Sequence, residues 1–434
     1  MKCINCQIDN KLKDRTANRG RCLRCSHQFA FEPTAMTGVK ITDPMFARAI
    51  ADISVNDTLF FTPKQLFYLL DRRSKPKISN FLLTVPGYLL LNFCLGIFGF
   101  IFTASFLSEG SIVWIAVVFV INSLLIKATF TASRSSKYPY QQRQKFAKTL
   151  QVWGGIVLVF GIGFNLLSSS FPLFLASSIL GLASIYLSGL EIDNKPANSQ
   201  KFTIDSNQFQ GWMNTWTKIN SLAKVLPSPR ETNENVAVSP DVSAYSFDRL
   251  VVCDRPEIAQ FLIANNFHFE NNCAVLSITG YPQSIFDITM QMLRRNPELK
   301  VYALHDCTPK GIGLVDRLRT SPNWFPDNSA IIIDIGLLPR QIMAAGDNMF
   351  VLSSEQNARD ARQLSAQIRQ DLSAEELQWL ELGNYVELES FSPQKLIQIL
   401  NRGIAGSRDL GGDDSSLILL GGTDSSIYVV DSFG

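Results

Sequence analysis

Four of the eight cysteines stand near the start of the chain in a pattern that suits a metal ion. Cys3 and Cys6 form one C-x2-C pair, and Cys22 and Cys25 form a second pair further along. Each pair bends the backbone so that two thiolates meet one ion, and four thiolates around Zn²⁺ complete a tetrahedral site. Such a closed site is structural rather than catalytic, because no position is left for a substrate. The spacing predicts structural zinc, with a redox dithiol as the alternative.

The segment that carries these cysteines is also basic. Its second pair lies in CLRCSHQFAFEP, which resembles the second knuckle of a zinc ribbon, and we expect the ribbon to span residues 1–33. A basic surface suits an anionic lipid headgroup or a nucleic acid. The Lys and Arg residues of the segment are Lys2, Lys11, Lys13, Arg15, Arg19, Arg21 and Arg24.

A second group of candidate residues lies in the last third of the chain, directly after short apolar runs. Asp254 and Asp306 each follow such a run, and two short loops occupy equivalent positions. Ligands of open α/β sheets bind beyond the carboxyl ends of the strands, so these residues are candidates to contact a phosphate or another ligand. The loop residues are Gly280, Tyr281, Pro282, Thr308, Lys310 and Gly311.

The elements that must position these residues alternate along residues 247–402. Short apolar runs predict parallel strands buried on both faces, and amphipathic helices between them are expected to cover the sheet. This part is therefore predicted to be an α/β domain. The expected strands are Arg249–Cys253, Cys273–Ile278, Lys300–His305 and Ala330–Ile335, and the expected helices are Pro256–Asn265, Gln283–Asn296 and Ile312–Thr320.

The order of these elements carries a resemblance. With ITGYP after the second strand and HDCTPKG after the third, it resembles the Toprim domain of the topoisomerase VI A subunit family. The stretch SAEELQWLELGNYVELESFSPQKLIQIL is similar to the region that follows Toprim in that family. The resemblance covers about Phe247 to Arg402 and implies a Toprim-like fold with a parallel sheet.

The resemblance also implies a metal site, from which this sequence departs. The family holds Mg²⁺ with a Glu at the end of the first strand and a D-x-D pair at the end of the third. Here Cys253 stands at the Glu position with Asp254 beside it, and the D-x-D pair reads Asp306 and Thr308. A hard cation needs several oxygen ligands, so we expect a degenerate site. An active site that uses Asp254 and Asp306 with Mg²⁺ is the alternative.

Two further candidates come from the same region and from the comparison with the family. Cys253, His305, Asp306 and Cys307 could converge on a softer ion such as Zn²⁺. The stretch from Thr62 to Tyr68 (TPKQLFY) resembles the T-x-R-x-L-Y-Y stretch around the catalytic Tyr of the family, which implies Tyr68 as a nucleophile. The stretch directly precedes an apolar block, however, where an aromatic side chain is ordinarily an anchor at the membrane interface.

The apolar block, residues 85–190, predicts a multi-pass membrane protein. Its four stretches are each long enough to cross a bilayer as a helix: Val85–Leu107, Ile112–Ala132, Leu150–Leu167 and Phe171–Leu190. Lys and Arg residues lie on both sides of the block and in the loop between its second and third stretches. The loops between the first and second stretches and between the third and fourth contain none. The positive-inside rule therefore places both termini in the cytoplasm, and a prokaryotic plasma membrane is the expected location.

Polar residues within the four stretches are few. Asn92, Asn122 and Asn165 are the main ones, and transport pathways usually need ionisable groups at bilayer depth. An anchor is therefore favoured over a small transporter with regulatory soluble domains. Small residues such as Ser177 and Gly181 suit close helix packing, within one chain or in an oligomer.

The remaining segments complete the expected organisation. Residues 34–84 are predicted to hold two juxtamembrane helices that begin after Thr42 and Thr62. Residues 191–246 read as an amphipathic helix over Ser206–Val225, suited to a membrane interface or to the following domain, and then a flexible linker. Residues 403–434 are a Gly/Asp-rich tail with a ten-residue repeat.

Function is predicted from this organisation as a whole. The zinc ribbon and a degenerate Toprim-like domain are expected to act at the cytoplasmic face as binding or regulatory modules. Expected partners are membrane lipid together with a nucleic acid, a nucleotide or a protein. A net charge of +2 argues neither for nor against nucleic acid. The alternative is a membrane-tethered nuclease or phosphotransferase that needs a divalent metal.

Overall fold

The computed structural model describes residues 1–75, 85–105, 109–134, 140–168, 171–193, 200–229, 247–296, 299–325, 330–345 and 349–406. The chain divides into two compact units. The first combines Met1–Pro76 with Lys201–Gly434, and the second is Lys77–Gln200. The predicted linker beyond residue 229 and the predicted repeat tail lie outside the described residues.

Two helices of the N-terminal part, α2 and α3, and one that follows the apolar block, α8, pack around a shared core. Thr42 and Thr62 cap α2 and α3 as predicted, since each hydroxyl accepts a backbone N–H from the first turn. The apolar face of α8 is buried against α2, α3 and Phe31 through Trp212 and Trp216. The helices are α2 (Asp43–Ile53), α3 (Pro63–Ser74) and α8 (Ser206–Thr217), and α1 (Leu12–Ala17) precedes them in the chain.

The placement of α8 corrects both readings of the predicted amphipathic helix. Its Trp side chains contact neither a membrane interface nor the α/β domain, because they are buried against Phe31, Phe46 and the apolar face of α3. Residues 34–75 and 201–226 therefore form one packed layer, although the apolar block separates them in the sequence.

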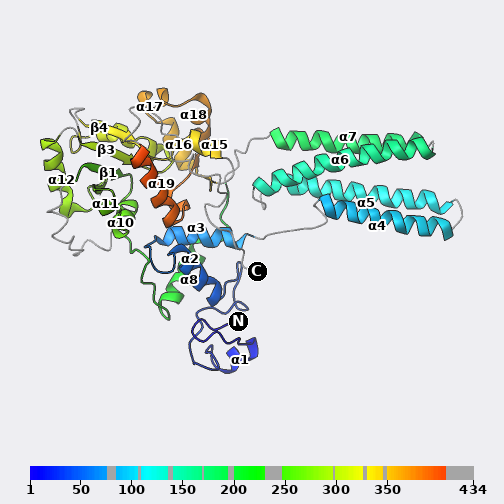
Figure 1. The fold of residues 1–434 in the computed structure, drawn as a ribbon, viewed down its shortest axis with the longest axis horizontal. Helices are drawn as coiled ribbons and strands as arrows, with labels where there is room; N and C mark the ends of the chain where they lie inside the picture. Colours follow the sequence, from blue (N-terminus) through cyan, green and yellow to red (C-terminus); the bar gives the residue numbers. More distant parts are fainter. Residues whose placement is uncertain are drawn as a thin grey trace. The chain divides into compact units, whose positions relative to one another are not determined.

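The α/β part is built on the predicted parallel sheet, in the order β2-β1-β3-β4. Figure 1 labels three of these strands, β1, β3 and β4. Alternate residues of β1 enter different cores: Leu250 and Val252 join one buried cluster, and Val251 and Cys253 join the other. Both faces of the sheet are thus covered, which explains the continuous apolar runs of its strands. The strands are β1 (Arg249–Cys253), β2 (Cys273–Ser277), β3 (Lys300–Leu304) and β4 (Ile331–Asp334).

The helices of this part lie close to their predicted positions. The helix predicted over Ile312–Thr320 begins at Leu314 as α14, and a short helix that was not predicted, α13, precedes it. The elements after β1 are α10 (Pro256–Ala264), α11 (Phe267–Glu270), α12 (Gln283–Arg295), α13 (Pro309–Ile312), α14 (Leu314–Thr320), α15 (Pro339–Ala345), α16 (Glu355–Arg362), α17 (Ala366–Gln370), α18 (Ala374–Glu381) and α19 (Pro393–Gly406). A small antiparallel pair joins β5 (Leu352–Ser353) to β6 (Asn384–Tyr385), and the 3-10 helix η3 spans Leu388–Ser390.

The second unit consists of long helices where the four apolar stretches were predicted. They are α4 (Val85–Ser105), α5 (Glu109–Arg134), α6 (Tyr140–Ser168) and α7 (Phe171–Asp193). Among the described residues, only the stretch Val117–Arg134 of α5 is long and apolar enough to cross a membrane, by length and composition. Shorter apolar stretches are Val85–Leu95 and Ser177–Leu190. The helices are therefore present as predicted, and four membrane spans stay a proposal.

Small residues bring α6 and α7 together. A Cβ atom added at Gly154 would lie 2.8 Å from the carbonyl oxygen of Gly181 and 3.0 Å from Cβ of Ser184, so a larger residue does not fit there. Between α4 and α5, the Asn122 amide donates to Oδ1 of Asn92 at 3.0 Å. These polar groups satisfy one another between helices, and the side chain of Asn165 lies outside the description.

Candidate metal centre and carboxylate cluster

The four N-terminal thiols lie together as the spacing predicts. Their sulfur atoms all lie within 4.8 Å of one another, with Cys3 to Cys25 at 3.6 Å and Cys6 to Cys22 at 3.5 Å. Four sulfurs at tetrahedral zinc distances are separated by about 3.8 Å. The donor set and its geometry therefore fit Zn²⁺.

The two cysteine pairs are held by the same backbone turn. The amide of Cys3 donates to the carbonyl of Ile8, and the amide of Cys22 donates to that of His27. The residue that follows each pair is in the left-handed region, with φ of 61° at Gln7 and 57° at Ser26. Two copies of one turn thus present their thiols to a common centre.

The thiols have unequal proton affinities. Burial raises the pKa of Cys3 to about 12. The backbone N–H of Cys25 lowers the pKa of Cys22 to about 6. The amide of the buried Asn10 also points at Cys22, with its nitrogen 3.5 Å from the sulfur. Cys22 is therefore the thiol most ready to meet the ion as a thiolate.

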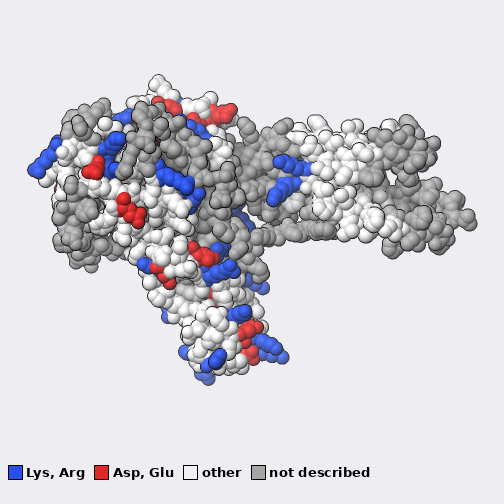
Figure 2. Space-filling view, viewed as in Figure 1, with Lys and Arg blue, Asp and Glu red and all other residues white. Residues whose placement is uncertain are grey.

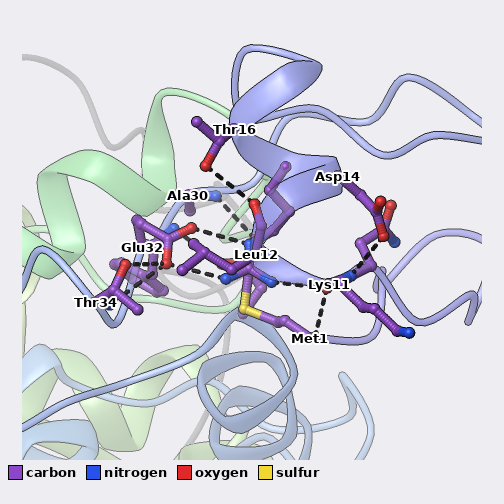
Figure 3. Close-up of polar contacts among 12 residues, drawn as sticks. Met1, Lys11, Leu12, Asp14, Thr16, Ala30, Glu32 and Thr34 are labelled. Atoms are coloured by element: carbon purple, nitrogen blue, oxygen red, sulfur yellow. Dashed lines mark hydrogen bonds and ion pairs between the residues drawn. The ribbon is translucent and has the colours of Figure 1, made fainter.

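A buried arginine ties the ribbon together. Arg15 makes a two-point ion pair with Glu32, at 2.9 and 3.0 Å, and donates to the carbonyl of Asn10 at 2.7 Å. Glu32 also accepts the hydroxyl of Thr34 at 2.8 Å (Figure 3). The Asp43 carboxylate at the start of α2 accepts the backbone N–H groups of residues 30 and 31, which attaches the ribbon to the helical layer.

The second candidate site lies at the carboxyl ends of β1 and β3, where the strand order reverses direction. The amide of Asp306 donates to Oδ2 of Asp254 at 3.0 Å, and the amide of Asp254 donates to the carbonyl of Leu304 at 2.9 Å. The Asp254 carboxylate therefore lies against the backbone of Asp306, and the two residues are brought together as their positions after neighbouring strands predict.

An arginine lies between the carboxylates of Asp306 and Glu389. The Arg255 guanidinium lies 2.9 Å from Oδ2 of Asp306 and 2.7 Å from Oε2 of Glu389. The amide of Leu388 donates to Oδ1 of Asp306 at 2.6 Å. Glu387 and Glu389 come from the segment before and within η3, and sequence reasoning did not select them. Their signal in the sequence is limited to the alternation of apolar and acidic residues in V-E-L-E, directly after β6.

Helix α3 and its N-cap residue Thr62 also contact these glutamates. The Tyr68 hydroxyl donates to Oε2 of Glu387 at 2.6 Å, and the Lys64 ammonium pairs with Oε1 of the same residue at 2.6 Å. The hydroxyl of Thr62 donates to Oε1 of Glu389 at 2.7 Å. We name Asp254, Asp306, Glu387 and Glu389 the carboxylate cluster.

The position of Tyr68 corrects the prediction of an anchor at the membrane interface. Its side chain is fully buried and packs edge-on against Phe350, with ring centroids 5.0 Å apart. The Glu387 carboxylate gives the hydroxyl a buried acceptor, which satisfies it without interfacial water. Burial, reinforced by the charge of Glu387, raises the pKa of Tyr68 far above its ordinary value.

The carboxylate cluster is buried together with several cations. Arg255 and Lys64 form ion pairs with its members, and the charges of His305 and Arg317 also act on Asp254. Burial raises the pKa of Asp306 to about 7; Arg255 opposes the rise, and the charges of Asp254 and Glu387 add to it. Burial also raises the pKa of Asp254. Burial thus favours the protonated forms of these two aspartates.

The alternative soft-metal site does not form. Within the described ranges, the N-terminal thiols are the only group of three or more His, Cys, Asp or Glu whose ligand atoms come within 4.8 Å of one another. His305 turns away to Oδ1 of Asp334 at 3.0 Å, while Cys253 and Cys307 are buried in an apolar core. These two thiols serve packing: Cys253 enters the covered face of the sheet from the end of β1, and Cys307 reaches the same core from the loop after β3.

The predicted ligand loops are internally satisfied. The Thr308 hydroxyl caps α13 by accepting the amide of Gly311 at 2.9 Å. A Cβ atom at Gly311 would overlap the carbonyl oxygen of Asp306, so the glycine allows the loop to fold back on β3. Gly280 has φ of 83° and turns the chain after β2 toward Tyr281 and Pro282. Lys310 is largely exposed and lies 3.5 Å from Asp360.

Comparisons with known proteins add no further assignment. A scan against protein-family models found none that matches this chain, and a search of curated proteins found no match to its sequence. The resemblance to the topoisomerase VI A subunit family thus depends on the short motifs and the strand order described above.

Proposed function

We propose that this chain is a membrane-anchored protein whose zinc ribbon and degenerate Toprim-like domain are binding or regulatory modules at the cytoplasmic face. A nucleic acid, a nucleotide or a protein is the partner that such a domain would bind. The observation that carries the proposal is the position of Arg255 between Asp306 and Glu389. The Arg255 guanidinium thus supplies the positive charge that a bound Mg²⁺ would supply in a metal-dependent enzyme.

The charge arrangement explains why this favours a non-catalytic domain. Mg²⁺ prefers octahedral coordination by oxygen atoms and keeps several waters. To bind at this site, Mg²⁺ would have to break the ion pairs of Arg255 with Asp306 and Glu389. The strand ends would then supply two carboxylate ligands, Asp254 and Asp306. Thr308 supplies no second carboxylate, since its hydroxyl caps α13. The residues present therefore do not fit Mg²⁺ while Arg255 is in place.

The surface of the second unit supports a membrane anchor. Large apolar side chains on its helices are mostly exposed, as at Phe93 (67%), Val159 (70%) and Ile179 (61%). In the view of Figure 2, the described surface of these helices is largely uncharged, with Lys and Arg gathered at one end. An apolar surface of this extent needs a partner, and lipid is the partner that suits helices of 21 to 29 residues.

Metal binding tests the proposal. We expect full-length protein in detergent, loaded with zinc, to bind no Mn²⁺ by electron paramagnetic resonance and to leave supercoiled DNA uncut. Arg255→Ala should gain Mn²⁺ binding, because it leaves buried carboxylates without their cation. Arg255→Lys keeps the charge and should bind none. Arg294→Ala, on the exposed face of α12, is the matched control.

The second candidate function is a metal-dependent nuclease or phosphotransferase. One observation favours it: the structure brings Tyr68 to 2.6 Å from Glu387, in the same cluster as Asp306. If this reading is correct, the unaltered chain binds Mn²⁺ tightly and forms a covalent adduct with DNA, and Tyr68→Phe abolishes the adduct. That result would overturn the binding-module proposal.

A further inference from the structure

Two leucines of the zinc ribbon project from its surface. Leu12 is 45% exposed and Leu23 is 57% exposed. Leu12 begins α1, and Leu23 lies inside the second cysteine pair. Their segments are joined by the buried Asn10, whose Oδ1 accepts the backbone N–H of Leu23 at 3.0 Å. The backbone at Leu23 is therefore tied to the buried Asn10, two residues before Leu12, so both leucines belong to the folded part of the ribbon.

Exposed cations surround both leucines in the sequence. Residues 1–33 contain seven Lys and Arg against three Asp and Glu, and only Arg15 of the seven is buried. Four thiolates around Zn²⁺ would remove about two positive charges from this excess. The exposed cations are Lys2, Lys11, Lys13, Arg19, Arg21 and Arg24. Figure 2 shows Lys and Arg atoms on the surface of the part that carries α1.

The acidic residues of the ribbon already have partners. Asp9 pairs with the N-terminal amine at 2.8 Å, and Asp14 accepts the backbone N–H of Lys11 at 2.9 Å (Figure 3). Glu32 is paired with Arg15. The exposed cations are therefore left to meet an external anion.

The side chains beside the cations indicate which anion fits. Single-stranded nucleic acids are held by exposed aromatic rings on which bases stack. The aromatic residues of residues 1–33 are Phe29 and Phe31, and both are buried. Aliphatic side chains between cations instead suit a bilayer surface, where leucine enters the headgroup region and the cations meet anionic headgroups.

We propose that the zinc ribbon docks on an anionic lipid surface through Leu12 and Leu23, with the surrounding Lys and Arg contacting the headgroups. This deepens the proposed function and rests on it, because a chain anchored in a bilayer keeps the ribbon near lipid. The ribbon would then respond to the lipid composition of its membrane.

Hydrogen exchange on the full chain tests the proposal. The zinc-loaded protein is placed in nanodiscs of phosphatidylcholine alone or mixed with phosphatidylglycerol. We expect amides of residues 11–24 to exchange more slowly in the anionic discs, and high salt to remove part of the difference. Leu12→Ser with Leu23→Ser should abolish it, provided that the variant retains its zinc. Leu382→Ser is the control: this leucine is 54% exposed but lies at the end of α18 in the α/β domain. The substitution should leave the difference in exchange between the two types of disc unchanged.

Two results separate the ribbon from the anchor. Failure of the chain to enter either type of disc contradicts the membrane anchor. Entry into both with equal exchange over residues 11–24 overturns the ribbon proposal alone. Protection of those residues by added nucleic acid or by a soluble protein, independent of disc composition, overturns it as well.

Discussion

At the scale of single residues, His305 is a buried charge held by two oxygen atoms. Nδ1 lies 2.8 Å from the carbonyl oxygen of Asp306, and Nε2 lies 3.0 Å from Oδ1 of Asp334. An ionised carboxylate and a carbonyl can only accept, so an imidazolium that donates from both nitrogens satisfies both. Although burial opposes the charge, Asp334 and the Asp306 carbonyl raise the pKa of His305 to about 9. Gly336 lies against the ring, where no side chain would fit.

This raised pKa predicts a dependence of stability on pH. A histidine whose pKa is higher in the folded than in the unfolded chain stabilises fully below its unfolded value near pH 6.5. That contribution is lost as the pH rises through about 9. Between about pH 7 and pH 9, the loss amounts to about 2 kcal/mol in the free energy of unfolding.

Urea unfolding of the full chain, followed by tryptophan fluorescence, measures this effect. His305→Gln should unfold at lower urea than the unaltered chain at pH 7, and the gap should narrow toward pH 9. The comparison with the variant is needed because other groups also make the stability of the folded chain depend on pH. Burial raises the pKa of Cys253 and Cys307, so these thiols lower the free energy of unfolding as the pH rises, by the same amount in both proteins. A gap that stays constant with pH would show that His305 is neutral in the folded chain.

At the scale of elements, α3 is the part that joins the helical layer to the α/β domain. Its first turn and its middle reach Glu387 and Glu389 through Thr62, Lys64 and Tyr68. The side-chain amide of Gln65 donates from Nε2 to the carbonyl of Phe391 at 3.2 Å on the same side. Burial opposes ionisation of Glu387, but the Lys64 ammonium outweighs it and lowers the pKa of Glu387. The carboxylate is thus ionised and able to accept from Tyr68.

The hydrogen bond from Tyr68 to Glu387 predicts that substitutions at these two residues have coupled effects on stability. Tyr68→Phe removes one hydrogen bond to a charged, buried acceptor and should lower the free energy of unfolding by about 1.5–3 kcal/mol. In a double-mutant cycle with Glu387→Gln, the two changes should be non-additive by about 1 kcal/mol or more. Glu355→Gln, at an exposed site on α16, is the control and should be additive. Additivity of Tyr68 and Glu387 would mean that the hydrogen bond does not stabilise the docking.

The same element shows where sequence reasoning stops. The thiols, the strands and the pairing of Asp254 with Asp306 were predictable, because each depends on local spacing or on strand order. Glu387 and Glu389 were not, since their role arises only when α3 and η3 pack together across 319 and more residues of chain. Arg255 stands two residues after the first strand, yet its ion-pair partner Glu389 is a residue that no local pattern reveals.

At the scale of the whole molecule, the first unit is made of chain from both sides of the apolar block. Met1–Pro76 and Lys201–Gly434 share one core, and hydrogen bonds such as Thr62 to Glu389 join them. If the block enters a bilayer, the chain must leave and return on the same side. The number of crossings is therefore even. A single crossing by Val117–Arg134 would place the two halves of this unit on opposite faces, where Tyr68 could not reach Glu387.

Limited proteolysis of oriented membrane vesicles tests this requirement. With the cytoplasmic face outward, protease should reach both the ribbon and the linker near residue 230, and in vesicles of the opposite orientation it should reach neither. The physical reason is that the packed interface of α3 with η3 and α8 forms only if both halves are in one compartment. Cleavage of one half in each orientation would imply an odd number of crossings. That outcome would contradict the shared core of the first unit, because the two halves that form this core would then lie in different compartments.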